Sequence, residues 1–135
     1  MILDVFSSDG IPTHILTLDA IRMYPMHLSS NGLMMFHVSN RYLTIAPQIA
    51  ASVQTLGLTA YTKLDVPDTR IRPFTMASQW VAVPLKQSQG AELLKQNWIK
   101  VEPGRTRAWT DQRSSLLTAI RPISVKISGH ADLVK

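Results

Sequence analysis

The chain has 135 residues and a formal net charge of +5, and 45% of its residues are hydrophobic while 17% are charged. This composition is typical of a single globular domain and excludes a disordered polyelectrolyte. The sequence contains no cysteine, which excludes disulfides and thiolate chemistry.

The first predicted elements are a short strand that ends at Leu3 and a helix that begins after Thr17. Thr17 is a plausible N-cap, and Asp19 lies in the first turn, where the helix dipole favours a negative charge. Pro25 removes a backbone hydrogen bond, so we expect a kink or an early stop there. The apolar face of this helix consists of Leu18, Ile21, Tyr24 and Leu28.

The next predicted elements are a turn at residues 29–32, a strand at 33–38 and a second helix. The strand sequence LMMFHV is continuously apolar, as in strands covered on both faces of a parallel sheet. Thr44 is the expected cap of the helix, Pro47 is tolerated in its first turn, and Gly57 ends it. Its buried side is expected to contain Ile45, Ile49, Val53 and Leu56.

The second half of the chain contains fewer clear signals. We expect strands at residues 58–64 and 79–85, separated by a proline-containing loop at 67–73, and then short helices at 90–98 and 111–120. Residues 1–121 form the predicted domain, and residues 122–135 are expected to be a loose tail or an added edge strand.

The order strand, helix, strand, helix, strand predicts an α/β domain with a mostly parallel sheet and flanking helices. In such sheets ligands bind beyond the carboxyl ends of the strands. If the strand ending at Leu3 neighbours the strand ending at Val38, two segments meet at that edge. The side chains that would share the crevice are Asp4, Asp9, His37, Ser39, Asn40, Arg41 and Tyr42.

Two carboxylates in this position suit the binding of a cationic amine. One carboxylate holds the ammonium group, and the other orients the amine or takes its proton so that the nitrogen becomes nucleophilic. The alternative is structural: Ser7, Ser8 and Asp9 have the composition of a turn or helix cap. His37 at the end of an apolar strand is similarly explained as a hydrogen-bonded packing residue, and Ser39 lacks the flanking glycines of a nucleophile elbow.

Three sequence stretches resemble the carboxy-terminal half of spermidine synthase-like proteins, in particular the bacterial branch fused to a transporter-like region. They are the loop D-x-F-S-S-D-x-I-P from Asp4, the strand end H-V-S-N-R-Y from His37, and the later W-T-D from Trp109. The resemblance implies a class I methyltransferase-type Rossmann-like sheet and aminopropyl transfer from decarboxylated S-adenosylmethionine to a diamine. It implies catalytic roles for Asp4 and Asp9, and amine-binding roles for Ser7, Ser8, His37, Ser39, Asn40 and Tyr42.

The sequence departs from this family in the residues that would hold the donor. None of its six glycines forms a G-x-G turn, Gln112 follows Asp111 where the family has a second acid, and the chain is expected to begin within the fourth strand of seven. We therefore expect no cofactor for this chain alone and no independent turnover. The expected partner is a second copy or a missing amino-terminal half, with a polyamine as ligand. The alternative function is a non-catalytic, self-associating assembly module that uses the same half-fold.

Other classes of protein fit the sequence less well. The four histidines do not have the spacing of zinc ligands, so we expect no metal. No apolar run approaches the roughly 20 residues of a transmembrane helix, and no signal peptide is evident, so we expect a cytoplasmic protein. The arginines are scattered and aromatic residues make up only 7% of the chain, which favours a solvated basic surface over a nucleic-acid interface.

Overall fold

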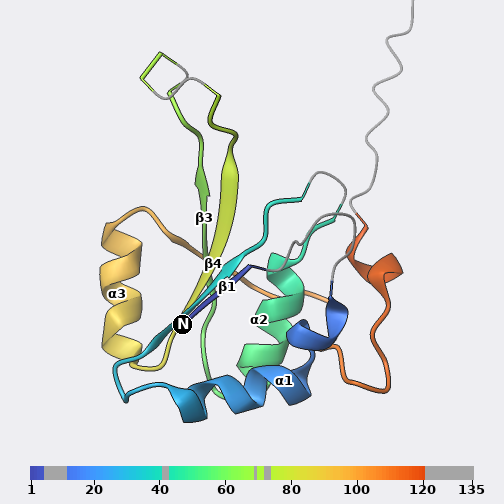
Figure 1. Cartoon of the computed structure of the whole chain (residues 1–135). Coiled ribbons are helices and arrows are strands. Elements are labelled where there is room, and N and C mark those ends of the chain that lie inside the picture. The colour runs from blue at the N-terminus through green and yellow to red at the C-terminus, as the bar shows by residue number, and fades with distance from the viewer. Residues whose placement is uncertain (5–11, 41–42, 69, 72–73, 121–135) are drawn as a thin grey trace, which may run out of the picture.

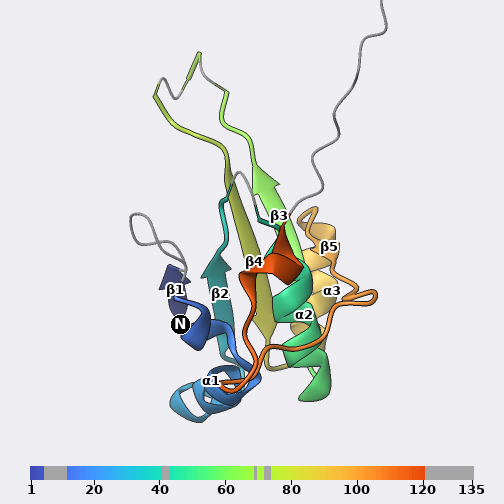
Figure 2. The same cartoon turned by 90° about the vertical axis from the view of Figure 1, so that its right-hand side faces the viewer.

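The structure is a computed structural model that describes residues 1–4, 12–40, 43–68, 70–71 and 74–120. In this part of the chain five strands form one sheet in the order β1-β2-β4-β3-β5, with helices on both faces (Figures 1 and 2). The strands are β1 (Ile2–Asp4), β2 (Leu33–His37), β3 (Tyr61–Asp65), β4 (Ser78–Pro84) and β5 (Ile99–Lys100). The α-helices are α1 (Leu18–Met23), α2 (Ala46–Thr55) and α3 (Gln87–Lys95), and three 3₁₀ helices are η1 (Thr13–Leu16), η2 (Tyr24–His27) and η3 (Leu116–Ala119).

The α/β class is as predicted, but the expected mostly parallel sheet is not confirmed. Only β1 and β2 pair in parallel, whereas β2–β4, β3–β4 and β3–β5 are antiparallel. The reason is the connection between β3 and β4, which contains no described helix and brings the chain straight back beside β3, as a hairpin does. Strands β1, β2 and β3 nevertheless run in the same direction, so their carboxyl ends lie at one edge of the sheet.

The two faces of the sheet are covered by different helices (Figure 1). Met34 and Phe36 of β2 are fully buried in the core that also contains Ile21 of α1 and Ile49 of α2. On the opposite face Gly90 of α3 packs against Tyr61 of β3. Residues 81–84 of the central strand β4 are buried on both faces.

The first helix agrees with the sequence prediction. Thr17 is the N-cap of α1 and its side chain accepts a hydrogen bond from Ala20 N–H at 3.2 Å. The α-helix stops at Met23, and the chain continues through Pro25 as the 3₁₀ helix η2. The proline therefore causes the predicted early stop, because it cannot donate the next α-helical hydrogen bond.

The second helix agrees in position but not in its cap. Pro47 lies in its first turn as predicted, and Gly57 follows its end with φ of +73°, a conformation that glycine adopts without strain. The residue at the N-cap position is Ile45, not Thr44, and no side chain caps this end. Thr44 instead donates its backbone N–H to Ala119 O at 2.8 Å, a tertiary contact that overrides its capping preference.

The later elements differ most from the prediction. Helix α3 lies three residues earlier than expected. At its start the Gln89 side chain accepts a hydrogen bond from Lys86 N–H at 3.3 Å and Gln89 N–H donates to Lys86 O at 3.0 Å, and after its end Asn97 adopts φ of +63°. The predicted helix at 111–120 is wrong: a tight turn joins Thr110 to Arg113, and only η3 is helical. The predicted tail at 122–135 lies outside the described residues. None of the helices in the described ranges is both long enough and apolar enough to cross a membrane.

Candidate functional site

The candidate site lies where the carboxyl ends of β1 and β2 meet. The parallel register places Asp4 opposite His37, and the antiparallel registers place His37 opposite Trp80 and Trp80 opposite Lys63. Directly paired residues project from the same face of a sheet, so an acid, an imidazole, an indole and an amine form one row across four strands. This row lies on the face that carries α3.

Asp4 and His37 form the centre of the row. His37 Nδ1 lies 3.0 Å from Asp4 Oδ1, and 66% of the Asp4 side chain is exposed to solvent compared with 26% of the His37 side chain. The imidazole is held on its other side by the Trp80 ring, whose centroid is 4.8 Å away at an interplanar angle of 33°. The carboxylate is thus fixed by a partner and open to a solute.

Ser39 links the His37 side chain to the backbone of β4. Its Oγ lies 2.7 Å from His37 Nε2 and accepts a hydrogen bond from Gln79 N–H at 2.8 Å. When the His37 ring is neutral and Nδ1–H donates to Asp4, Nε2 accepts a hydrogen bond from the Ser39 hydroxyl. The imidazole is therefore fixed at both nitrogens, as in sites where a histidine is oriented by a carboxylate.

The sequence predicted the meeting of Asp4 with His37 and Ser39, because both strands end in polar residues. It did not predict Trp80 or Lys63 in the same row, because that alignment depends on the register of β4 against β2 and β3. Lys63 Nζ donates to Gln96 O, beyond the end of α3, at 2.9 Å, and Trp80 Nε1–H donates to Ser78 Oγ at 3.2 Å. These contacts hold both side chains at the sheet surface.

The other predicted site residues are distributed differently. Asn40 Oδ1 accepts a hydrogen bond from Leu43 N–H at 2.9 Å. Its role in substrate binding stays a prediction. The remaining predicted residues, Ser7, Ser8, Asp9, Arg41 and Tyr42, lie outside the described part of the chain.

The chemistry available at this edge is that of an exposed, oriented carboxylate beside an imidazole. Such a pair attracts a cationic group, accepts hydrogen bonds from an ammonium, and receives or passes on a proton. Within the described residues no group of three or more histidine, aspartate or glutamate side chains is arranged to hold a metal ion.

Comparison with known proteins adds no relative from which a role could be transferred. No family model, no curated protein and no solved structure matches the chain. The functional argument depends on the chain's own residues and geometry.

Proposed function

We propose that this chain carries the amine-binding part of a spermidine synthase-like aminopropyltransferase site. In this proposal Asp4 holds the ammonium group of a diamine and positions its nitrogen, and His37 orients the Asp4 carboxylate. Asp9 is the second acid in the same proposal. The observation that carries it is the 3.0 Å pair between Asp4 and His37 at the common carboxyl end of β1 and β2.

The strand order supports this proposal at the level of the fold. In the class I methyltransferase-type sheet the last strand is antiparallel and lies between the two strands that precede it in the chain. Here β4 follows β3 in sequence, lies between β2 and β3, and is antiparallel to both. This arrangement agrees with the four carboxy-terminal strands of that fold.

The meeting of two of the resembling segments gives a second line of support. Asp4 begins the D-x-F-S-S-D-x-I-P stretch and His37 begins the H-V-S-N-R-Y stretch, and the two side chains are in contact although 33 residues separate them. Ligand sites in α/β sheets lie at this edge. These two stretches therefore contribute to one location, whereas the third, W-T-D from Trp109, lies beside α1.

The residues described do not fit the adenosyl donor. A nucleoside or phosphate cradle in such folds needs a glycine-rich turn that presents backbone N–H groups after a strand. Here β2 is followed by Val38, Ser39 and Asn40, and β3 by Val66 and Pro67. Residues outside the described set would have to hold the donor, and we expect amine binding without turnover by the chain alone.

Calorimetric titration with putrescine tests the proposal. We expect the wild-type chain to bind putrescine and Asp4→Asn to weaken binding by about 10-fold or more, because a hydrogen bond to a charged group contributes about 1.5–3 kcal/mol. Asp68→Asn is the matched control, since Asp68 is also an exposed aspartate but lies on the β3–β4 connection beside Arg70. Titrations with 5′-methylthioadenosine in the same buffer test whether the chain binds the nucleoside part of the donor.

Two outcomes would contradict the proposal. One is a folded wild-type chain that does not bind putrescine. The other is an equal loss of binding in Asp4→Asn and Asp68→Asn, which would show a general effect of negative charge. Circular dichroism of each variant establishes that the fold is retained.

A second function, a self-associating assembly module, is favoured by one observation. The described residues of the β3–β4 arm, 64–68, 70–71 and 74–77, extend away from the helices (Figure 1) and include five strongly exposed apolar side chains. They are Leu64, Val66, Ile71, Phe74 and Met76, with exposed fractions from 61% to 102%. We propose a second copy of the chain as the partner of this arm in that alternative.

A further inference from the structure

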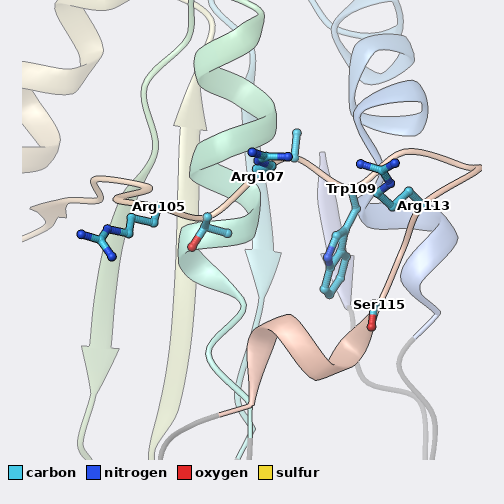
Figure 3. Close-up of a pocket in the computed structure, with 7 residues that line it drawn as sticks. Arg105, Arg107, Trp109, Arg113 and Ser115 are labelled. Carbon is cyan, nitrogen blue, oxygen red and sulfur yellow. The ribbon is translucent and has the colours of Figure 1, made fainter.

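A second candidate ligand site lies in the segment that follows β5, away from the Asp4–His37 pair. A cavity of about 480 Å³ is lined by the arginine side chains of this segment together with Thr106, Trp109 and Ser115 (Figure 3). This volume is within the range of about 300–1,000 Å³ that is usual for small-molecule sites. The three arginines are Arg105, Arg107 and Arg113.

The positive charge of this cavity is not neutralised by the described residues. Within the part of the chain that the structure describes, none of the three arginine side chains forms an ion pair or a hydrogen bond. The neighbouring acids are engaged elsewhere: Glu102 pairs with Lys100 at 2.8 Å, and Asp111 accepts a hydrogen bond from Thr17 Oγ1 at 2.7 Å. An anion entering the cavity would therefore meet guanidinium groups rather than competing carboxylates.

The tight turn at residues 110–113 places its acidic and its basic side chain in two different cavities. Thr110 and Arg113 exchange backbone hydrogen bonds of 3.1 and 2.9 Å across this turn. Asp111 lines a different cavity beside α1, together with Asp19, whereas Arg113 lines the arginine cavity. The turn thus directs its acid toward α1 and its arginine toward Trp109.

The floor of the cavity is held in place before any ligand binds. Gln48 on α2 is buried, and with its amide nitrogen turned toward Arg107 O it donates there at 2.9 Å while its amide oxygen accepts from Trp109 Nε1. Trp109 O in turn accepts from Leu18 N–H at 2.7 Å, and the Trp109 side chain is almost fully buried. Figure 3 shows the Arg107 and Arg113 side chains on either side of the indole, and Arg105 farther along the segment. A preorganised backbone lowers the entropy that ligand binding must overcome.

We propose that this cavity binds a small, multiply charged oxyanion, held by Arg107 and Arg113 beside Trp109. Guanidinium groups match the paired oxygens of phosphate and carboxylate groups through two parallel hydrogen bonds, and two arginines suit a ligand with more than one negative charge. Phosphate esters and polycarboxylates share this chemistry. The site is independent of the proposed amine site, whose residues do not line this cavity.

Calorimetry of the full chain with inorganic pyrophosphate and, separately, with citrate tests this proposal. We expect binding of at least one of the two anions, and a loss of about 10-fold or more in the Arg107→Gln, Arg113→Gln double variant, because charge-assisted hydrogen bonds are lost. The matched control is the Arg22→Gln, Arg70→Gln double variant, which removes the same charge from exposed positions on α1 and the arm. Amide resonances of residues 105–115 report the location of binding.

The possible outcomes distinguish the ligand classes from one another and from a failure of the proposal. Preference for pyrophosphate supports a phosphate ester, preference for citrate supports a polycarboxylate, and similar binding of both supports the shared oxyanion chemistry. The proposal is overturned if neither anion binds, or if the two double variants lose affinity equally, which would show an effect of net charge alone. A thermal melt of each variant provides the check on folding.

Discussion

Thr17 shows how one small side chain joins distant parts of this molecule. It is completely buried, it caps α1 through Ala20 N–H, and its hydroxyl donates to Asp111 Oδ1 at 2.7 Å although 94 residues separate the two. Asp111 N–H also donates to Asp19 Oδ2 at 3.0 Å. The first helix and the segment after β5 are thereby fixed to each other at their polar ends.

We expect Thr17→Val to lower the free energy of unfolding by about 2 kcal/mol, since both the helix cap and the hydrogen bond to Asp111 are lost while the volume is retained. Urea denaturation followed by circular dichroism measures this change. Thr55→Val is the control: Thr55 Oγ1 donates to Ala51 O at an exposed helix end, and its loss should change the stability by less than about 0.5 kcal/mol. Equal effects of the two variants would contradict the role assigned to Thr17.

The same residues show what the sequence could predict at this scale. Thr17 was identifiable as a cap because it directly precedes an apolar helical pattern, and Asp4 and His37 because each ends an apolar strand. The contact with Asp111 was not predictable, because nothing local in the sequence specifies a partner so far along the chain. Thr44 fits the local capping rule equally well, yet its backbone pairs with Ala119 instead.

At the scale of elements, α3 depends on a close approach between a helix and a strand. Gly90 is buried in the middle of α3, and a Cβ atom added there would lie 2.8 Å from Tyr61 Cζ and even closer to the Tyr61 hydroxyl. Contacts below 3.0 Å require something to shift. The absence of a side chain at Gly90 therefore lets α3 lie against β3.

We expect Gly90→Ala to destabilise the protein by about 1–3 kcal/mol through overpacking. The sign of the stability change is informative, because replacing glycine by alanine at an open helix position would stabilise the protein by about 0.5–1 kcal/mol. The Gly90→Ala, Tyr61→Phe double variant should lose less stability than the sum of the single changes, since the closest atom is removed. Ser88→Ala, at an exposed position of α3, is the control, and thermal or urea denaturation measures all four variants. A stabilised Gly90→Ala variant would show that α3 is not packed as described.

Elements with strong local signals were predictable, and those defined by tertiary contacts were not. Strand β2 and helix α2 have clear apolar patterns and lie within a few residues of their predicted positions. The segment at 111–120 has leucines and polar residues in a helix-like pattern, but the Thr110–Arg113 turn and its contacts with α1 keep it mostly irregular. The pairing of β5 with β3 had no signal, since only Ile99 and Lys100 take part.

At the scale of the whole molecule, strand direction decides where polar residues gather. Strands β1, β2 and β3 share one direction, so the predicted edge for the site exists although three of the four strand pairs are antiparallel. The antiparallel insertion of β4 brings Trp80 beside His37. The sequence predicted the site at the carboxyl ends of β1 and β2. The row of side chains across the sheet depends on β4, whose direction the sequence did not specify.

The same architecture leaves apolar surface without a described partner in two places. Strand β1 lies at one end of the strand order, and its Ile2 is 73% exposed. On the β3–β4 arm Phe74 is fully exposed and adopts φ of +69°, a conformation that costs a non-glycine residue about 1–2 kcal/mol. Exposed apolar groups of this kind mark interaction sites, and strained backbone positions are concentrated at functional positions.

If the arm mediates self-association, the purified chain should form a dimer or larger species. The Val66→Ser, Phe74→Ser double variant should shift the equilibrium toward monomer by about 10-fold or more, because each removed apolar side chain contributes roughly 1.5–3 kcal/mol when buried. Light scattering over a dilution series measures the effect. Met26→Ser is the control, since Met26 is 73% exposed on η2, away from the arm. A wild-type chain that stays monomeric throughout the series would remove the assembly function and leave amine binding as the proposal. Association that both variants leave unchanged would place the interface outside the arm, and β1, the end strand among the described strands, would be the next element to test.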